Sequence, residues 1–445
     1  MSSTRRDFLQ AMGLAAASAA IPASGLAAQE AKRPVHPAGL LRRALDENSV
    51  NVVYYLIDAL RADHLGIHGY HRELAPNIRA LAEQGITFTH AFANATWTKP
   101  SVASTFASVP AEAQGWRGLG GQVPNALVLF TEVLRERFAE TCIVTENPYP
   151  TAISNLARGS SFVKRTGLPS YHEQWEFSLN EALSFLQHHK DRRFFLYVHT
   201  MEPHAPYRPK PHYLNLVMSP GEEPEDVDRY DAEIALADDN LQRFVSKLKS
   251  LGLYEKTLLI ITADHGEAFR EHEGLEFHGG KPYNELIHVP LIMHLPGVLP
   301  RGETVQQAVQ LRDISPTILD VFNAPIPEQF QGKSLLPLIE GRTEGFQDRT
   351  IFSTSAGVTA AVKGRWKLLS GSGMHSLFDL SADPQERKDV AGAHSAVATL
   401  LSEETKAHHA RQRAVRAAIQ KKEDAATVEL DTDELEALRA LGYIE

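Results

Sequence analysis

The sequence predicts an α/β fold, in which a doubly wound and mostly parallel β-sheet carries helices on both faces. Dense runs of β-branched, aromatic and other apolar residues recur along the chain, and stretches with helical periodicity separate them. Continuous apolar runs are typical of strands buried on both faces, and strands that alternate with helices favour a parallel sheet. The expected parallel strands are residues 51–57, 142–145, 194–198, 258–262 and 289–294.

The first apolar run, residues 51–57, is followed directly by Asp58. Open α/β sheets bind ligands at the carboxyl ends of their strands, so Asp58 is a candidate site residue. Residues 76–84 then predict a short helix, because Pro76 stands at its start and Gly85 follows its end. Residues 86–88 predict a strand that returns toward the site.

Thr98 precedes a stretch, residues 101–108, that predicts another helix. Free backbone N–H groups at a helix amino terminus favour an anion, so Thr98 would lie next to an anion-binding position. Later helices are expected at residues 178–188 and 230–251, with an acidic, proline-containing surface loop at residues 218–228.

The pattern changes after about Gly341, where short strand-like pieces replace the long apolar runs. Residues 342–445 therefore predict a small antiparallel α+β lobe, and residues 29–341 form the main domain. A last short helix is expected at residues 432–442, and its role, docking or following a flexible linker, stays open. The pieces of the lobe are strands at 350–354, 360–362, 366–369 and 377–379, and a charged helix at 394–422.

Composition narrows the classes of protein. With 445 residues, 43% hydrophobic and 22% charged, the chain is long enough for a large globular enzyme. Its formal net charge of −10 argues against a nucleic-acid partner, although a metal pocket can still bind an anion within an acidic protein. The single cysteine, Cys142, excludes an internal disulfide.

The first residues resemble an export signal. Arg5 and Arg6 precede an apolar, alanine-rich stretch, residues 12–28, that ends in small residues. This order predicts a bacterial twin-arginine-type signal peptide at residues 1–28 and a periplasmic or secreted protein; the alternative is an ordinary amphipathic first helix. Pro22 and the shortness of the stretch argue against a permanent membrane span.

Groups suited to metal-assisted ester hydrolysis follow two of the expected strands. Asp58 follows the first, and Asp264 and His265 follow residues 258–262. Two carboxylates, an imidazole and the Thr98 oxygen can together hold one divalent ion. Such an ion lowers the pKa of the hydroxyl group and makes neutral threonine, a poor nucleophile by itself, a good one.

Two further segments, residues 194–207 and 276–285, offer imidazoles that could bind the transferred group or protonate the departing alcohol. In the first, His204 is better placed than His199, which has the simpler explanation of an internal hydrogen bond. In the second, His278 and Lys281 are rivals. Each residue alone also has a structural reading, because an aspartate after a strand often caps a helix or forms a turn.

The order and flanking residues of these motifs resemble the sulfatase family of the alkaline phosphatase superfamily, over almost all of residues 51–445. The resemblance implies a sulfatase-like catalytic domain in which Asp58, Asp264 and His265 bind the metal and Thr98 is the nucleophile. It also implies that His204 contacts the substrate anion and that His278, or its rival Lys281, lies beside the leaving oxygen, with His272 as a further contact. The matching segments are residues 56–66, 75–77, 81–88, 283–292, 313–320 and 377–384.

Four positions depart from the family pattern. Thr98 replaces the cysteine that sulfatases convert to formylglycine, so no formylglycine is expected, and Val102 replaces the signature arginine. Ala59 replaces the second aspartate of the usual pair, and His265 replaces an asparagine. The loss of a carboxylate and the gain of an imidazole favour Mn or Zn as the one divalent metal ion, with Ca as the alternative.

A threonine also changes the expected reaction. Formylglycine releases sulfate by collapse of a hemiacetal, whereas a threonine ester must be hydrolysed directly, which suits phosphorus better than sulfur. The chain is thus similar to phosphonate monoester and phosphodiester hydrolases, and its expected substrate is a small-molecule or headgroup phosphate ester. A sulfuric ester hydrolase acting on a sugar or small alcohol sulfate and a degenerate anion-binding protein remain the alternatives. The oligomeric state stays open.

Overall fold

The computed structural model describes residues 40–444, apart from 48, 117, 138–139, 166–175, 219–220, 222, 273 and 424–426. The expected export signal, residues 1–28, lies outside the described residues. Among the helices that are described, none combines the length and the apolar character needed to cross a membrane.

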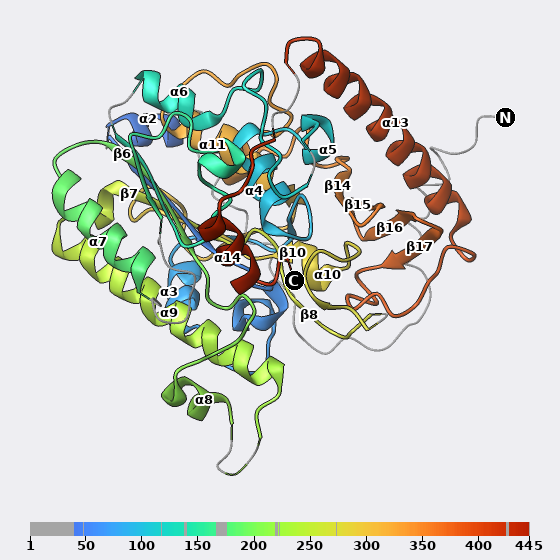
Figure 1. Cartoon of the computed structure of the whole chain (residues 1–445), viewed down its shortest axis with the longest axis horizontal. Coiled ribbons are helices and arrows are strands. Elements are labelled where there is room, and N and C mark those ends of the chain that lie inside the picture. Colours follow the sequence, from blue (N-terminus) through green and yellow to red (C-terminus); the bar gives the residue numbers. More distant parts are fainter. Residues whose placement is uncertain are drawn as a thin grey trace, which may run out of the picture.

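The main body is built on an eight-stranded sheet with the order β12-β2-β11-β7-β1-β6-β4-β5 (Figure 1). Its five strands from β7 to β5 run parallel, with β1 between β6 and β7. Every residue of β1 is buried, as its apolar run requires. The expected α/β class is confirmed. These strands are β1 (Asn51–Ile57), β4 (Glu140–Thr145), β5 (Phe162–Arg165), β6 (Phe194–Thr200) and β7 (Thr257–Thr262).

The expected parallel strand at residues 289–294 is wrong in direction and in extent. The structure has β11 (Leu291–His294), which is antiparallel to β7 and to β2 (Ile86–Phe88). Pro290 has no N–H group to donate to a ladder, and it separates β11 from β10 (His288–Val289). β10 pairs with β3 (Ala91–Phe92) in a second, three-stranded sheet that also contains β13 (Val309–Gln310), and β12 (Glu303–Val305) completes the main sheet.

Helices cover both faces of the main sheet, in two groups that Figure 1 shows on opposite sides of it. The first group contains α3 (Pro76–Glu83), α7 (Phe177–His189) and α9 (Asp226–Ser250). The second contains α2 (Leu40–Glu47), α4 (Thr98–Ala107), α6 (Phe130–Arg137) and α11 (Ile314–Val321). Shorter helices are α5 (Ala111–Gln114), α8 (Pro211–Val217), α10 (Asn284–Ile287) and α12 (Leu336–Ile339).

Helix α9 begins earlier than its apolar pattern indicates. The Glu225 side chain accepts a hydrogen bond from the backbone N–H of Asp228, and the Asp228 carboxylate accepts one from the N–H of Glu225, which forms a capping box. The end of the expected acidic loop, residues 218–228, is therefore the first turn of this helix.

The small antiparallel lobe is confirmed. Four strands pair in sequence order, and α13 (Ser395–Gln420) packs against them. Trp366, Leu377 and Leu401 lie in an apolar cluster distinct from the main core. The strands are β14 (Ile351–Ser355), β15 (Val358–Lys363), β16 (Trp366–Gly371) and β17 (Met374–Asp379).

Helix α14 (Thr432–Ala440) follows the lobe in sequence but packs on the main body, and Figure 1 shows it in dark red near the middle of the molecule. Leu438 lies in a buried cluster with Tyr149 and Ile153. Ahead of the helix, the Val428 N–H group donates to the Gly120 carbonyl at 3.0 Å.

A buried ion pair of the small lobe contacts the main body through Asn284. Lys367 Nζ of β16 lies 2.8 Å from Glu386 Oε1, both side chains have zero exposure, and the same ammonium group donates to Asn284 Oδ1 of α10. Lys367→Met leaves the carboxylate of Glu386 buried without a cation, and we expect it to cost about 3 kcal/mol of unfolding free energy in urea titrations. The double variant Lys367→Met/Glu386→Gln should recover part of this loss. An unchanged urea midpoint in Lys367→Met would contradict the role of the pair.

Candidate active site

The site lies where parallel strands of the main sheet end side by side. Asp58 follows β1, Asp264 follows β7 after one residue, and His199 is the penultimate residue of β6. The helix expected at residues 101–108 begins three residues earlier, so Thr98 is the first residue of α4 instead of preceding it, and Trp97 is the amino-terminal cap residue. All four side chains are completely buried.

The three expected metal ligands come together. Asp58, Asp264 and His265 each offer one ligand atom, and these atoms lie within 4.8 Å of one another. Thr98 Oγ1 lies 3.2 Å from His265 Nε2 and 3.4 Å from Asp58 Oδ2. The nucleophile expected from sequence therefore adjoins the cluster.

The donor atoms of this cluster fit a divalent cation. Asp58 Oδ1 and Asp264 Oδ2 are buried and have no hydrogen-bond partner, an arrangement that costs free energy unless a cation faces them. Burial raises the pKa of both carboxyl groups, and the neighbouring Asp58 charge raises that of Asp264 further. A cation between the two carboxylates would remove this penalty and keep both ionised.

His265 has the tautomer that a metal ligand requires. Its Nδ1 lies 2.8 Å from the Gly266 carbonyl and donates to it, which leaves the Nε2 lone pair facing Asp58 and Thr98. Burial holds the pKa of His265 well below its usual range. Gly266 permits this turn, because a Cβ there would lie 2.0 Å from the Glu285 carbonyl oxygen.

Two residues without an assigned role orient Asp58. His199 Nε2 donates to Asp58 Oδ2 at 2.8 Å, and its Nδ1 lies 2.9 Å from the Tyr197 hydroxyl group. Burial lowers the pKa of His199 to about 4, so the ring is neutral. Asn147 Nδ2 donates to the same carboxylate oxygen at 3.1 Å. The internal hydrogen bond foreseen for His199 thus fixes a candidate metal ligand.

His204 and His278 form the opposite wall. Their ring centroids are 4.6 Å apart, and the His278 ring stacks on that of His265 at 4.8 Å. His204 Nδ1 donates to the Ala205 carbonyl, and its Nε2 is buried without a partner. Burial opposes the charged form of His278, but Glu267 Oε1, 3.2 Å from His278 Nδ1, outweighs burial and raises the pKa of this ring.

The other candidates from the sequence, His278, Lys281 and His272, differ in their surroundings. His278 is the rival that contacts His204 and His265. Lys281 is half-buried, and its carbonyl accepts a hydrogen bond from the Tyr283 N–H group. His272 does not join the site: its ring stacks on Tyr283 at 3.9 Å, and its two nitrogens face Glu285 Oε1 and the Glu386 carbonyl. The expectation of a substrate contact there is wrong, because both nitrogens bind protein groups.

One contact of the site comes from far along the chain. The Tyr443 hydroxyl group, just beyond α14, lies 2.6 Å from Thr98 Oγ1 and 3.4 Å from Asn147 Nδ2. Sequence reasoning missed Asn147, Glu267 and Tyr443. Asn147 lies two residues after β4, so the rule that led to Asp58 applies to it as well. Glu267 stands within the Asp264 motif, and nothing local marks Tyr443.

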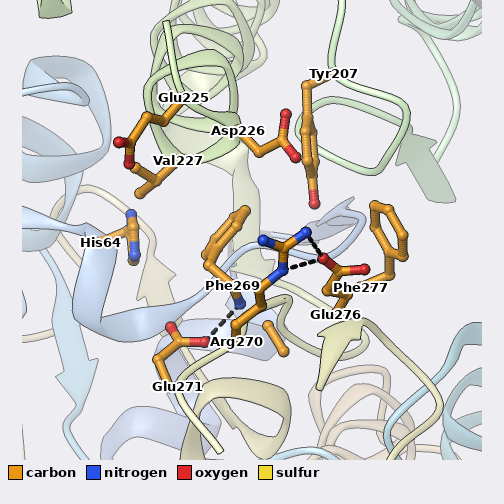
Figure 2. A pocket seen from close by; sticks show the side chains of 11 residues that line it. His64, Tyr207, Glu225, Asp226, Val227, Phe269, Arg270, Glu271, Glu276 and Phe277 are labelled. Atoms are coloured by element: carbon orange, nitrogen blue, oxygen red, sulfur yellow. Dashed lines mark hydrogen bonds and ion pairs between the residues drawn. The ribbon is translucent and has the colours of Figure 1, made fainter. Parts of the chain in front are cut away.

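A surface pocket of about 440 Å³ is lined by residues that lie near the two histidines in sequence. Tyr207 continues the loop of His204, and Phe277 precedes His278. Figure 2 shows the Arg270 guanidinium group turned toward Glu276 near the Tyr207 hydroxyl group. Carboxylates outnumber cations in the lining, which also includes Glu225, Asp226, Phe269 and Glu271.

This fold and this site define the class of protein, an α/β protein with a buried candidate metal centre at the carboxyl ends of its parallel strands. A family model described as Sulfatase matches residues 50–324, and one described as N-sulphoglucosamine sulphohydrolase, C-terminal, matches residues 277–412. Since the first match covers more than half of the sequence, the chain belongs to the sulfatase family.

Curated relatives carry sulfatase names. The chain is 23% identical to an arylsulfatase of Clostridium perfringens over 434 residues, which covers 76% of this chain and 89% of that protein. It is 34% identical to arylsulfatase K of Homo sapiens over 178 residues, which covers 36% of this chain and 33% of that protein. The chain thus matches about a third of the length of arylsulfatase K.

Solved structures with the same fold include a phosphonate monoester hydrolase and a protein in complex with a sulfated sugar. The phosphonate monoester hydrolase of Agrobacterium radiobacter gives a TM-score of 0.68 at 20% identity, covering 82% of this chain and 96% of that one. A protein solved with its substrate D-glucosamine-2-N,6-O-disulfate gives 0.67 at 16% identity, covering 84% and 99%. At these identities the structural similarity establishes the fold and does not identify the substrate of this chain.

Proposed function

We propose that the chain is an exported, metal-dependent hydrolase that cleaves a phosphodiester, a phosphonate or a phosphate ester through a covalent Thr98 intermediate. One observation carries the proposal: a threonine hydroxyl group, and no cysteine, lies beside the buried Asp58, Asp264 and His265 cluster at 3.2 Å from the imidazole. Mn or Zn suits this oxygen and nitrogen donor set, with Ca as the alternative.

The residues divide the work as follows. Asp58, Asp264 and His265 hold the ion, which when bound lowers the pKa of the Thr98 hydroxyl group and draws charge from the substrate oxygens. Thr98 gives up its hydroxyl proton to solvent and Oγ1 attacks phosphorus, so that a new Oγ1–P bond forms while the bond from phosphorus to the departing alcohol breaks. His204 binds an anionic oxygen through Nε2, and His278 gives its proton to the alcohol.

The second half of the reaction regenerates the enzyme. Water attacks phosphorus on the side that the alcohol has left, and neutral His278 takes the proton from that water. The Oγ1–P bond breaks, Thr98 Oγ1 takes up a proton from solvent, and the phosphate or phosphonate departs. Glu267 holds His278 in position through Nδ1 in both halves, since its carboxylate lies 3.2 Å from that nitrogen.

The pocket lined by Tyr207 and Phe277 offers room for the alcohol part of the substrate. Its lining continues from the loops that carry His204 and His278, and Tyr207 and Phe277 supply aromatic surface. This supports a small organic ester or a lipid headgroup as the substrate, and a polynucleotide backbone fits poorly with the excess of carboxylates.

Sulfate ester hydrolysis is the second candidate, supported by the family match and by the arylsulfatase relatives. The buried Val102 stands where the family places an arginine, and its side chain is 2% exposed in the apolar core. With neither the cysteine nor this arginine, hydrolysis of a threonine sulfate has no counterpart of the hemiacetal route. A protein that only binds anions is the third candidate.

Parallel assays on metal-reconstituted protein separate these candidates. We expect kcat/KM on an aryl phosphodiester or aryl phosphonate monoester to exceed that on the matching aryl sulfate by about 100-fold, or roughly 2.7 kcal/mol of transition-state stabilisation. An aryl phosphomonoester completes the series. Faster turnover of the sulfate would overturn the phosphoryl preference, and no turnover at full metal occupancy would favour the anion-binding protein.

A further inference from the structure

We propose that Tyr443 is a further catalytic residue of the Thr98 site, supplied by the segment that follows α14. Its hydroxyl group holds Thr98 Oγ1 before attack and then donates a hydrogen bond to an anionic oxygen of the group that Thr98 receives. The inference rests on the proposed transfer to Thr98, and it assigns to α14 a part in the active site.

The position of the hydroxyl group carries the inference. It lies 2.6 Å from Thr98 Oγ1, the atom that attacks, and 3.4 Å from Asn147 Nδ2. The centroid of the Tyr443 ring is 5.8 Å from that of the His204 ring and 5.4 Å from that of the His278 ring. Tyr443 therefore contacts the groups that must surround the substrate anion.

Backbone hydrogen bonds also fix the position of Tyr443. Gly442 has a positive φ of 72°, its N–H donates to the Arg439 carbonyl at 2.9 Å, and the Tyr443 N–H donates to the Leu438 carbonyl at 2.9 Å. This pair of bonds is the Schellman ending of a helix, in which a left-handed glycine turns the chain back. The end of α14 thus directs Tyr443 into the site.

Two aromatic rings fix the orientation of the side chain. The Tyr443 ring lies 5.2 Å from that of Tyr149, with an interplanar angle of 69°, and 6.2 Å from that of Trp97. Trp97 is the residue before the nucleophile, and Tyr149 lies two residues after Asn147 in the segment that follows β4. Such edge contacts immobilise the ring before substrate arrives, as electrostatic catalysis requires.

The chemistry follows from the spacing. Negative charge builds up on the non-bridging oxygens of the transferred group as the Oγ1–P bond forms, and these oxygens lie one further bond from Oγ1. A phenol donor already within hydrogen-bond distance of Oγ1 can reach one of them by a small shift. Phenol hydroxyl groups both donate and accept, so the same group serves the resting and the reacting state.

Tyr443→Phe tests the hydroxyl group and keeps the ring. We expect kcat on the aryl phosphodiester to fall by about 10- to 100-fold, as when one donor to a developing oxyanion is removed, with KM changed by less than about 3-fold. Tyr55→Phe is the matched control: its hydroxyl group, on a residue of β1, is buried without a hydrogen-bond partner. This control should stay within about 2-fold of the wild type.

The outcomes are distinct. Unchanged kcat in Tyr443→Phe would overturn the proposal, and a higher kcat/KM in Tyr443→Phe or Tyr443→Ala would show that the residue obstructs the site. Calorimetric binding of inorganic phosphate to the metal-loaded proteins separates this inference from the proposed function. If the wild type cleaves no ester but Tyr443→Phe weakens phosphate binding at equal metal content, the function fails and the contact stands. Equal phosphate binding in that case would overturn both.

Discussion

Thr98→Ala is expected to lower kcat on the preferred aryl ester by about 1,000-fold or more, because no other hydroxyl group replaces the atom that forms the covalent bond. The substitution removes one small buried group at the start of α4, where the backbone hydrogen bonds of the helix do not depend on it. Metal content and the thermal unfolding midpoint should therefore stay close to those of the wild type.

Two controls define this result. Thr98→Ser keeps the hydroxyl group and should retain measurable turnover. Ser104→Ala removes a buried hydroxyl group from the same helix, where Ser104 Oγ donates to the Pro100 carbonyl at 2.6 Å, and should stay within a few-fold of the wild type. A trapped intermediate, seen by intact-protein mass spectrometry as a phosphoryl adduct on Thr98, would establish the covalent step. If Thr98→Ala kept more than a tenth of the wild-type kcat, direct attack by water would replace the proposal.

His265→Ala and Asp264→Asn are expected to abolish stable metal binding, with the loss of nearly all activity. Each removes one of the three donors that converge within 4.8 Å, and the two remaining donors cannot complete a protein site for a divalent ion. Elemental analysis after dialysis measures the ion content. His204→Ala is the matched control, since it should lose activity and keep the ion. Unchanged ion content in both ligand variants would refute the assignment.

The metal-free protein gives an independent readout of the same cluster. Burial raises the folded-state pKa of Asp58 and of Asp264 above the unfolded values. A carboxyl group of this kind stabilises the fold at low pH, and this contribution is lost as pH rises through the folded pKa. After removal of metal with a chelator, Asp264→Asn should therefore melt at a higher temperature than the wild type at pH 8, with little difference at pH 5. The reverse order would mean that the carboxylates are not held together.

The sequence predicts those parts of the molecule that depend on local pattern. The apolar run of residues 51–57 coincides with β1, and Asp58 and the Asp264–His265 pair lie at strand ends as the rule for α/β sheets requires. The direction of a strand relative to its neighbours is not predicted in this way. Periodicity does not distinguish a parallel from an antiparallel strand, and β11 reverses because of how its neighbours pair.

Contacts between distant segments explain the other misses. Tyr443 and Thr98 are 345 positions apart, and the packing of Leu438 and Leu441 on the main body helps to bring them together. His272 has the local appearance of a site residue, but the small lobe supplies the Glu386 carbonyl that occupies its second nitrogen. Which distant residues contact one another depends on the tertiary structure, and composition and residue spacing do not predict it.

The attachment of α14 has a consequence for measurement. The helix is anchored by few buried side chains, Ala437, Leu438 and Leu441, and then by Tyr443 at the nucleophile. Local opening of a segment becomes rarer when a ligand binds only the closed form. Amide hydrogen exchange in α14 should therefore slow when an anion that contacts Tyr443 occupies the site. The backbone of one surface helix would then report occupancy of a buried catalytic centre for any ligand, coloured or not.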